Sequence, residues 1–252
     1  MNPETWQAFY ERARTNGELI EIVIRSLYTD NLPSDAVALD GGANVGYHTL
    51  SLARQLSRGQ VIAVEANSKT LEVLCRAVQP YPNVKVVYGA LQDDSAKTGI
   101  EFHCSSSHPG RSGVGKLWDL IDQGQVQYEA PTTVPATTID RLVQENELNR
   151  LDFIKLDLEG GEFPALRGGE RTLRELRPLV VTEHGHLAPA LNGFGIAEYL
   201  EWLRSVDYVP VSPAGVPVEI SSPYPFWYIF LVPVEQLGLW SARIRSALEA
   251  HI

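Results

Sequence analysis

Cysteine is nearly absent from this chain of 252 residues, which contains Cys75 and Cys104 and no others. These two do not form a C-x-x-C pair, so the sequence predicts neither a disulfide framework nor a zinc site. Long apolar runs are also missing. The longest, at 226–232, is far too short to cross a bilayer, and no basic segment followed by an apolar one opens the chain. We therefore expect a cytoplasmic protein with no membrane partner.

Positive charge is in deficit as well. The formal net charge is -10 at pH 7, and lysine and arginine do not gather in a run. Such a chain is a poor electrostatic match for a phosphate backbone, so nucleic acid is not an expected partner. Hydrophobic residues make up 44% of the chain, which is enough for the core of one large domain.

Apolar strands and amphipathic helices alternate along most of the chain. Strands are predicted at 36–40, 60–66, 83–91, 151–159 and 178–184, with helices between them. Repeated units of this kind form a mostly parallel sheet with helices on both faces, so the predicted fold class is α/β and Rossmann-like. Two last strands, YVPVSP and FWYIFLVP, have no helix between them and are expected to pair as a terminal antiparallel hairpin.

Two segments fall outside this alternation. Residues 1–34 show helical periodicity and are predicted to form an N-terminal helical cap. Residues 93–135 include a stretch rich in Gly, Pro and Ser, and they are predicted to form an irregular, lid-like insertion with a short hairpin. The remaining residues, 35–252, are expected to form one domain that contains this insertion.

The segment DGGANVG, at 40–46, follows the first predicted strand. Ligands of open parallel sheets bind outside the carboxyl ends of the strands, where this segment is expected to lie. Gly42 and Gly46 would let a ligand approach the backbone, and Asn44 tolerates a left-handed conformation better than most residues. The alternative interpretation is a tight turn that only packs the first helix on the sheet.

The second predicted strand ends in Glu65, 19 residues after Gly46. An acidic residue at about this distance accepts hydrogen bonds from ribose hydroxyls, so we expect a bound adenosine. A solvated carboxylate at the strand end is the alternative. Asp40 and Asp157 are predicted to end strands at the same edge. Three acids there would oppose the pyrophosphate of a dinucleotide but favour the ammonium and sulfonium of S-adenosylmethionine.

Four segments resemble the FkbM family of S-adenosylmethionine-dependent methyltransferases, and they occur in the family's order: LDGGANVGYHTL, VIAVEAN, TTIDRL and LDFIKLDLEGGEFPALRGG. The resemblance covers roughly residues 35–185. It implies a seven-stranded methyltransferase fold and, usually, O-methylation of a hydroxyl on a natural product or sugar. Gly41 departs from the commoner family form, which has valine there. The candidate cofactor-binding residues are Asp40, Gly41, Gly42, Asn44, Gly46, Tyr47, Glu65, Ala66 and Asp157.

Three residues are candidates for the chemical step. Asp157 and Glu159 alternate along the fourth predicted strand and would face one side if that strand continued, where either could orient or deprotonate an acceptor hydroxyl. Capping of the next helix is the alternative role for Asp157. His184, after the fifth strand, is the first choice for a general base because histidine titrates near neutral pH; a hydrogen-bonded histidine at a strand end is equally compatible. With Glu183 these side chains could also hold a divalent metal ion, which their spacing alone does not predict.

Other functions share these patterns. A nicotinamide-dependent oxidoreductase uses a related fold, a non-catalytic module could keep the cofactor site alone, and the methylated atom could be nitrogen instead of oxygen. We expect a small hydroxylated molecule as the acceptor. Neither its identity nor the oligomeric state follows from the sequence.

Overall fold

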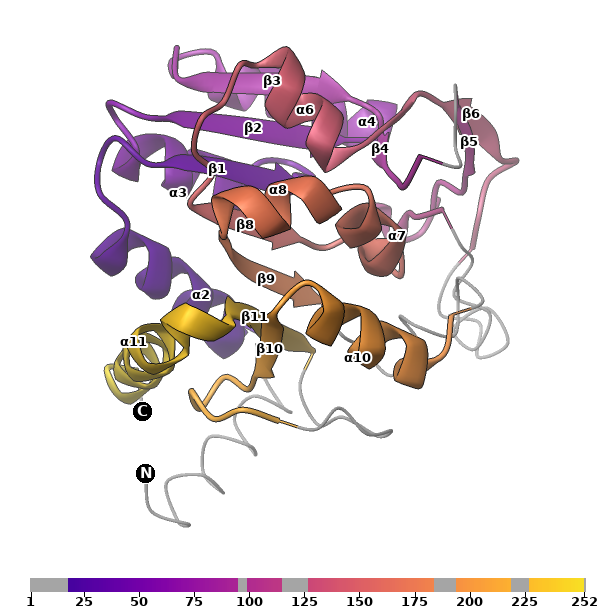
Figure 1. Ribbon diagram of the computed structural model, residues 1–252. Helices are drawn as coiled ribbons and strands as arrows, with labels where there is room; N and C mark the ends of the chain where they lie inside the picture. Colours follow the sequence, from indigo (N-terminus) through magenta and orange to yellow (C-terminus); the bar gives the residue numbers. More distant parts are fainter. Residues whose placement is uncertain (1–17, 95–98, 115–126, 184–193, 219–226, 252) are drawn as a thin grey trace.

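The computed structural model describes residues 18–94, 99–114, 127–183, 194–218 and 227–251. At its centre lies a sheet with the strand order β10-β11-β9-β8-β1-β2-β3 (Figure 1). In that order the strands are Tyr208–Val211, Tyr228–Pro233, Leu179–Glu183, Phe153–Leu156, Val37–Gly41, Gln60–Glu65 and Val84–Tyr88. Within this sheet β11 runs antiparallel to both of its neighbours, and the other pairs are parallel. The predicted mostly parallel sheet with a terminal antiparallel hairpin is confirmed.

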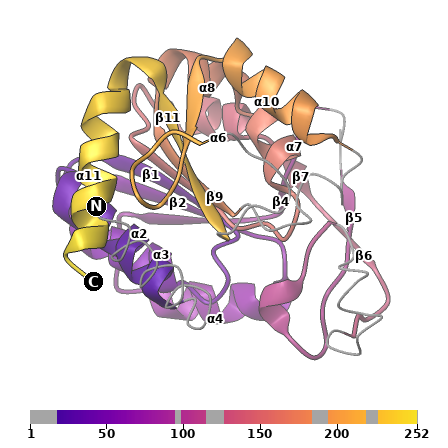
Figure 2. The ribbon, with the colours of Figure 1, turned by 90° about the horizontal axis from the view of Figure 1, so that it is seen from below.

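Helices cover both faces of the sheet (Figure 2). One layer contains α2 (Glu18–Asn31), α3 (Tyr47–Gln55), α4 (Ser68–Val78) and α11 (Leu237–Glu249). The other contains α6 (Ile139–Glu145), α7 (Glu162–Arg167), α8 (Glu170–Leu176) and α10 (Ile196–Ser205). Short 3₁₀ turns lie at Pro109–Arg111 (η1) and Val234–Gln236 (η2).

Helix α2 belongs to the same core as the sheet. Ile20, Ile24 and Leu27 recur at helical spacing and are all buried, with Ile24 and Leu27 fully so. Their stripe packs into the main hydrophobic cluster, and α2 lies against α3 and α11. The described part of the predicted cap is thus held firmly against the rest of the fold. Residues 1–17 lie outside the described residues.

The third and fourth strands are shorter than predicted. Gly89 has a φ of +155° and turns the chain directly after Tyr88. The next residues, Ala90–Leu91 (β4), leave the main sheet and pair with Ala136–Thr137 (β7). The fourth strand, β8, already ends at Leu156, and the chain then turns instead of continuing through 159.

The insertion carries a small sheet of its own. Ile100–Phe102 (β5) pairs antiparallel with Thr132–Val134 (β6). Residues 95–98 and 115–126, within the predicted insertion, lie outside the described residues. Among the helices that the structure describes, none has the length and apolar character needed to span a membrane.

Candidate functional site

The glycine loop lies against the end of β8. The backbone N–H groups of Gly42 and Ala43 both donate to the carbonyl of Val64 at 3.0 Å. Gly42 has a φ of +74°, and a Cβ atom placed there would lie 1.9 Å from the carbonyl oxygen of Asp157. Close contact between two chain segments therefore requires glycine at this position. Asn44 adopts a left-handed φ of +50°, the conformation for which asparagine is suited.

Glu65 ends β2 with its carboxylate held at the glycine loop. Its Oε2 accepts a hydrogen bond from the Asn44 N–H at 2.6 Å, and its Oε1 accepts one from the Asn67 N–H at 2.6 Å. Burial raises the pKa of Glu65, although these two hydrogen bonds favour its ionised form. A carboxylate offers about four acceptor sites, so Glu65 can still accept a hydrogen bond from a ligand.

A first cavity opens beside Glu65 at the carboxyl ends of β1 and β2. Its apolar walls are formed by Val64, Ala66, Leu91, Phe102 and Val114. Phe102 and Val114 come from the insertion, where Ser112 accepts a hydrogen bond from Asn67 Nδ2 at 3.3 Å. The described part of the insertion therefore forms one wall of this cavity.

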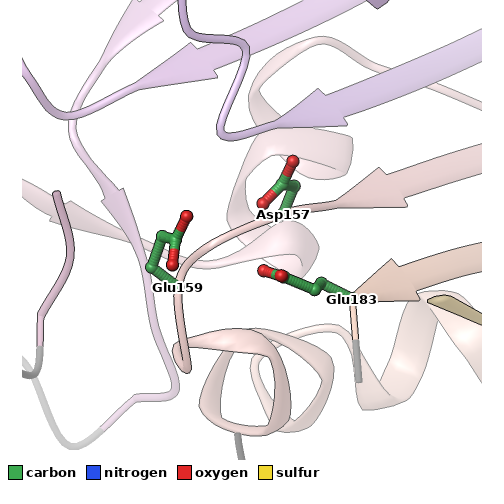
Figure 3. Close-up of side chains that lie close together, drawn as sticks. All are labelled: Asp157, Glu159 and Glu183. Atoms are coloured by element: carbon green, nitrogen blue, oxygen red, sulfur yellow. The ribbon is translucent and has the colours of Figure 1, made fainter. Parts of the chain in front are cut away.

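Three carboxylates meet where β8 and β9 end (Figure 3). Asp157 directly follows β8, Glu159 stands in the next loop, and Glu183 is the last residue of β9. One oxygen of each lies within 4.8 Å of the others, which is close enough to hold a metal ion together. The predicted continuation of the strand through Glu159 is wrong, because Glu159 has a left-handed φ of +52°. A turn, and not strand alternation, brings the side chains of Asp157 and Glu159 together.

The three acids bind protons unequally. Burial opposes the ionisation of Asp157, but the charge of Lys155 and a hydrogen bond from Glu183 outweigh it and lower the pKa of Asp157. Burial and the negative charge of Asp157 raise the pKa of Glu183 well above its ordinary value. The same two causes raise the pKa of Glu159 to about 8. Near neutral pH the cluster thus holds an ionised Asp157 beside a protonated Glu159.

Lys155 is the buried cation behind this cluster. Its Nζ atom lies 3.3 Å from Asp157 Oδ2 and 4.0 Å from Asp40 Oδ1. Burial lowers the pKa of Lys155, but the two acids more than reverse this effect. Asp40 also accepts a hydrogen bond from Thr49 Oγ1 at 2.5 Å, so its carboxylate is fixed beneath the loop. Lys155 therefore pairs with a carboxylate at the end of each of two neighbouring strands.

A second cavity begins at three residues that also line the first, namely Gly42, Asn44 and Asp157. It extends to α2, which contributes Glu21 and Arg25. The sequence interpretation did not include these two residues. Opposite charges four residues apart are the ordinary pattern of an exposed helix face, so their spacing carried no signal of a site.

Glu21 joins α2 to the strand ends. Its Oε2 lies 2.5 Å from His48 Nε2, and its Oε1 lies 2.8 Å from the hydroxyl of Tyr228. The same hydroxyl is 2.9 Å from Asp157 Oδ2 and has one proton to donate to either acid. The His48 contact and that hydroxyl both help to lower the pKa of Glu21 against the opposing effect of burial.

Residues 40–210 match the methyltransferase FkbM domain. The chain belongs to the FkbM methyltransferase family. The 2-O-methyltransferase NoeI of Sinorhizobium fredii is 24% identical over 72% of this chain and 76% of its own length. The hexuronic acid methyltransferase AglP of Haloferax volcanii is 26% identical over 66% of this chain and 63% of its own length. A solved FkbM methyltransferase from Methylobacillus flagellatus superposes with a TM-score of 0.50 at 15% identity, over 80% of this chain and 44% of that one.

The FkbM assignment confirms the resemblance predicted from the four sequence segments. The sheet order and the terminal antiparallel pair are those of the class I methyltransferase fold. The chain spans less than half the length of the solved family structure.

The remaining predicted residues of this FkbM methyltransferase take different positions. Ala66 lines the first cavity, and Tyr47 stands half exposed at the second. Gly46, with a φ of +98°, precedes α3 as its N-cap. Gly41 is packed within β1 and lines neither of these two cavities. His184 lies outside the described residues.

Proposed function

We propose that this protein transfers the methyl group of S-adenosylmethionine to a hydroxyl of a sugar or other small natural product. One observation carries the proposal. The first cavity extends from Glu65, an acceptor suited to ribose hydroxyls, to Asp157 and Glu159, where the acidic cluster begins. A cofactor seated at Glu65 would thus place its reactive end beside groups able to bind and deprotonate an alcohol.

The types of residue that line the first cavity suit an adenosine, although the cavity's volume of about 60 Å³ means that the walls must part to admit one. The apolar walls suit the adenine ring, and the fixed carboxylate of Glu65 would accept hydrogen bonds from both ribose hydroxyls. The negative edge formed by Asp157 and its neighbours favours a cationic sulfonium over a pyrophosphate. When bound, the cofactor supplies a methyl group already activated by that sulfonium.

The acidic cluster supplies what an alcohol acceptor needs. A free hydroxyl is a weak nucleophile, so a positioned base assists the transfer. Glu159 lines the first cavity, and a carboxylate with a pKa raised to about 8 is a stronger base than an ordinary one. We assign to Glu159 the role of the base that accepts the hydroxyl proton. The ionised Asp157 orients the hydroxyl. His184 is the second candidate for the base.

The class of acceptor follows from the family and the site together. One relative is named for 2-O-methylation and another for methylation of hexuronic acid, which is a hydroxylated sugar. An uncharged amine would need no base, whereas this site gathers three acids around the predicted methyl position. These observations favour oxygen over nitrogen as the methylated atom.

Two other functions make different predictions for binding. A nicotinamide-dependent oxidoreductase would bind NAD in preference to S-adenosylmethionine. A non-catalytic module would bind S-adenosylmethionine and methylate nothing. Should the three carboxylates hold a divalent cation, chelation would abolish turnover without abolishing cofactor binding.

Replacing Glu65 by alanine should weaken the binding of S-adenosylhomocysteine by at least about tenfold, because hydrogen bonds to a charged group are each worth about 1.5–3 kcal/mol. Calorimetry would measure this loss. The wild-type protein should also bind adenosine more tightly than dideoxyadenosine, and Glu65→Ala should remove that preference.

Glu72→Ala is the matched control, because Glu72 is an exposed acid on the adjacent helix α4, paired with Arg76. It should leave both affinities unchanged. A Glu65→Ala protein that folds normally and still prefers adenosine over dideoxyadenosine would place the ribose elsewhere.

A further inference from the structure

The second cavity offers space next to the proposed adenosine site. Its volume is about 460 Å³, and it meets the first cavity at Gly42, Asn44 and Asp157. A ligand that filled the first cavity from Glu65 onwards would therefore reach the second by crossing these three residues. The far wall of the second cavity belongs to α2, the helix that precedes the sheet in the chain.

The walls of this cavity carry charges of both signs. Glu21 and Asp157 are acids with lowered pKa values, so both are ionised at neutral pH. Arg25 supplies a guanidinium at the opposite end of the same helix turn. A cavity with this arrangement suits a zwitterion better than a neutral group or a simple ion.

Arg25 has no acidic partner among the residues that the structure describes. Its natural partner is Glu21, four residues earlier on α2, but the carboxylate of Glu21 is engaged by His48 and Tyr228. Among the described residues Arg25 forms no ion pair, and its guanidinium carbon lies 5.7 Å from the centre of the Tyr47 ring. The ring orients the guanidinium without neutralising it, so within the described part of the chain this charge is unpaired and available to an anion.

We propose that the second cavity binds the amino-acid end of the cofactor, with Arg25 paired to its carboxylate and Glu21 facing its ammonium. This assignment rests on the proposed function and extends it to α2. Arginine suits the role because its planar donors match a carboxylate bidentately. Discrimination between the intact cofactor and its fragments would then come from α2, and affinity for adenosine from Glu65.

Two ligands separate this assignment from the adenosine site. S-adenosylhomocysteine has the amino-acid end, and methylthioadenosine shares the adenosine and the sulfur but lacks both charges. Calorimetry should show that Arg25→Ala lowers the affinity for S-adenosylhomocysteine by about tenfold and leaves the affinity for methylthioadenosine unchanged. Arg25→Lys should restore part of the loss, and added salt should shrink the difference between wild type and Arg25→Ala.

Arg243→Ala is the matched control. Arg243 lies over the ring of Trp240 on α11, at 4.8 Å from its centre, and lines neither cavity. The Arg243→Ala variant should bind both ligands with the affinities of the wild type. An Arg25→Ala protein that loses affinity for both ligands equally, or for neither, would overturn the assignment. If neither ligand binds the wild type, the cofactor assignment fails, and this inference fails with it.

Discussion

Replacing Glu159 by glutamine should lower turnover by about 10²–10⁴-fold, the usual contribution of a general base, and should stabilise the fold at the same time. Glu159 has a pKa raised from 4.5 to about 8 in the folded protein. The folded state therefore binds this proton more tightly than the unfolded state, and wild-type stability falls as the pH rises from the unfolded value to the folded one. Glutamine does not ionise, so it escapes this loss.

The stability gain has a defined pH window. Denaturant unfolding at about pH 5 should show little difference between wild type and Glu159→Gln. At about pH 9 the free energy of unfolding of the variant should be higher by about 1–2 kcal/mol. This is less than the full pKa shift would give, because Glu159 is partly exposed and solvent screens its charge. Glu72→Gln changes an exposed acid of α4 and serves as the control, for which we expect no pH-dependent difference. A Glu159→Gln protein that turns over normally and is less stable at pH 9 would make Glu159 a structural residue.

The pH dependence of the rate identifies the base. With Glu159 as base, kcat/KM should rise with pH through a midpoint at about 8, because the ionised form accepts the proton. The bound sulfonium favours the ionised carboxylate, so the midpoint for kcat should be lower. A histidine would give a midpoint near 6.5, its ordinary value. If the midpoint lies near 6.5 and His184→Ala removes it, His184 and not Glu159 is the general base.

Replacing Gly42 by alanine should weaken cofactor binding by about 100-fold or more, equivalent to about 2.7 kcal/mol, and should destabilise the fold by about 2–4 kcal/mol. Two costs combine at this position. The φ of +74° is unfavourable for a residue with a Cβ atom, and that atom would lie 1.9 Å from the carbonyl oxygen of Asp157. The loop must move away from β8, which separates the walls of both cavities. Thermal unfolding and calorimetry would measure the two effects.

Gly238→Ala is the control for this substitution. Gly238 lies in α11, where an added Cβ atom meets nothing within 4 Å. Alanine there should stabilise the helix by about 0.5–1 kcal/mol. A Gly42→Ala protein with normal stability and normal cofactor affinity would mean that the loop adapts freely and that glycine is not needed there.

Much of the fold was predictable because its elements follow local rules. The alternation of apolar strands and helices predicted a parallel sheet, and the missing helix between the last two strands predicted their antiparallel pairing. The glycine loop and Glu65 were also predictable, since both occur at strand ends whose spacing follows from the fold. The hydrogen bonds from Asn44 and Asn67 hold the Glu65 carboxylate at the loop, while its role in binding ribose stays a prediction.

The rest depended on contacts that spacing does not encode. Glu159 reaches Asp157 through a left-handed residue in a turn, which an alternating strand pattern cannot reveal. Glu21 and Arg25 join the site because the first turns of α2 lie beside the strand ends, more than a hundred residues from Asp157 in the sequence. Glu21 is bonded to His48 and Tyr228, and Arg25 forms no ion pair among the described residues. This difference arises only once the tertiary contacts have formed.

The most direct measurement of the central claim is the fate of the methyl group itself. The protein would be incubated with S-adenosylmethionine carrying an isotopically labelled methyl group and with a panel of hydroxylated sugars and small natural products. Nuclear magnetic resonance of the products would then locate the label. We predict a methyl ether on one of these acceptors, and Glu65→Ala should reduce its formation at limiting cofactor. A label found on nitrogen would contradict O-methylation. Cofactor binding without transfer to any acceptor, or binding of NAD instead, would contradict the proposed function.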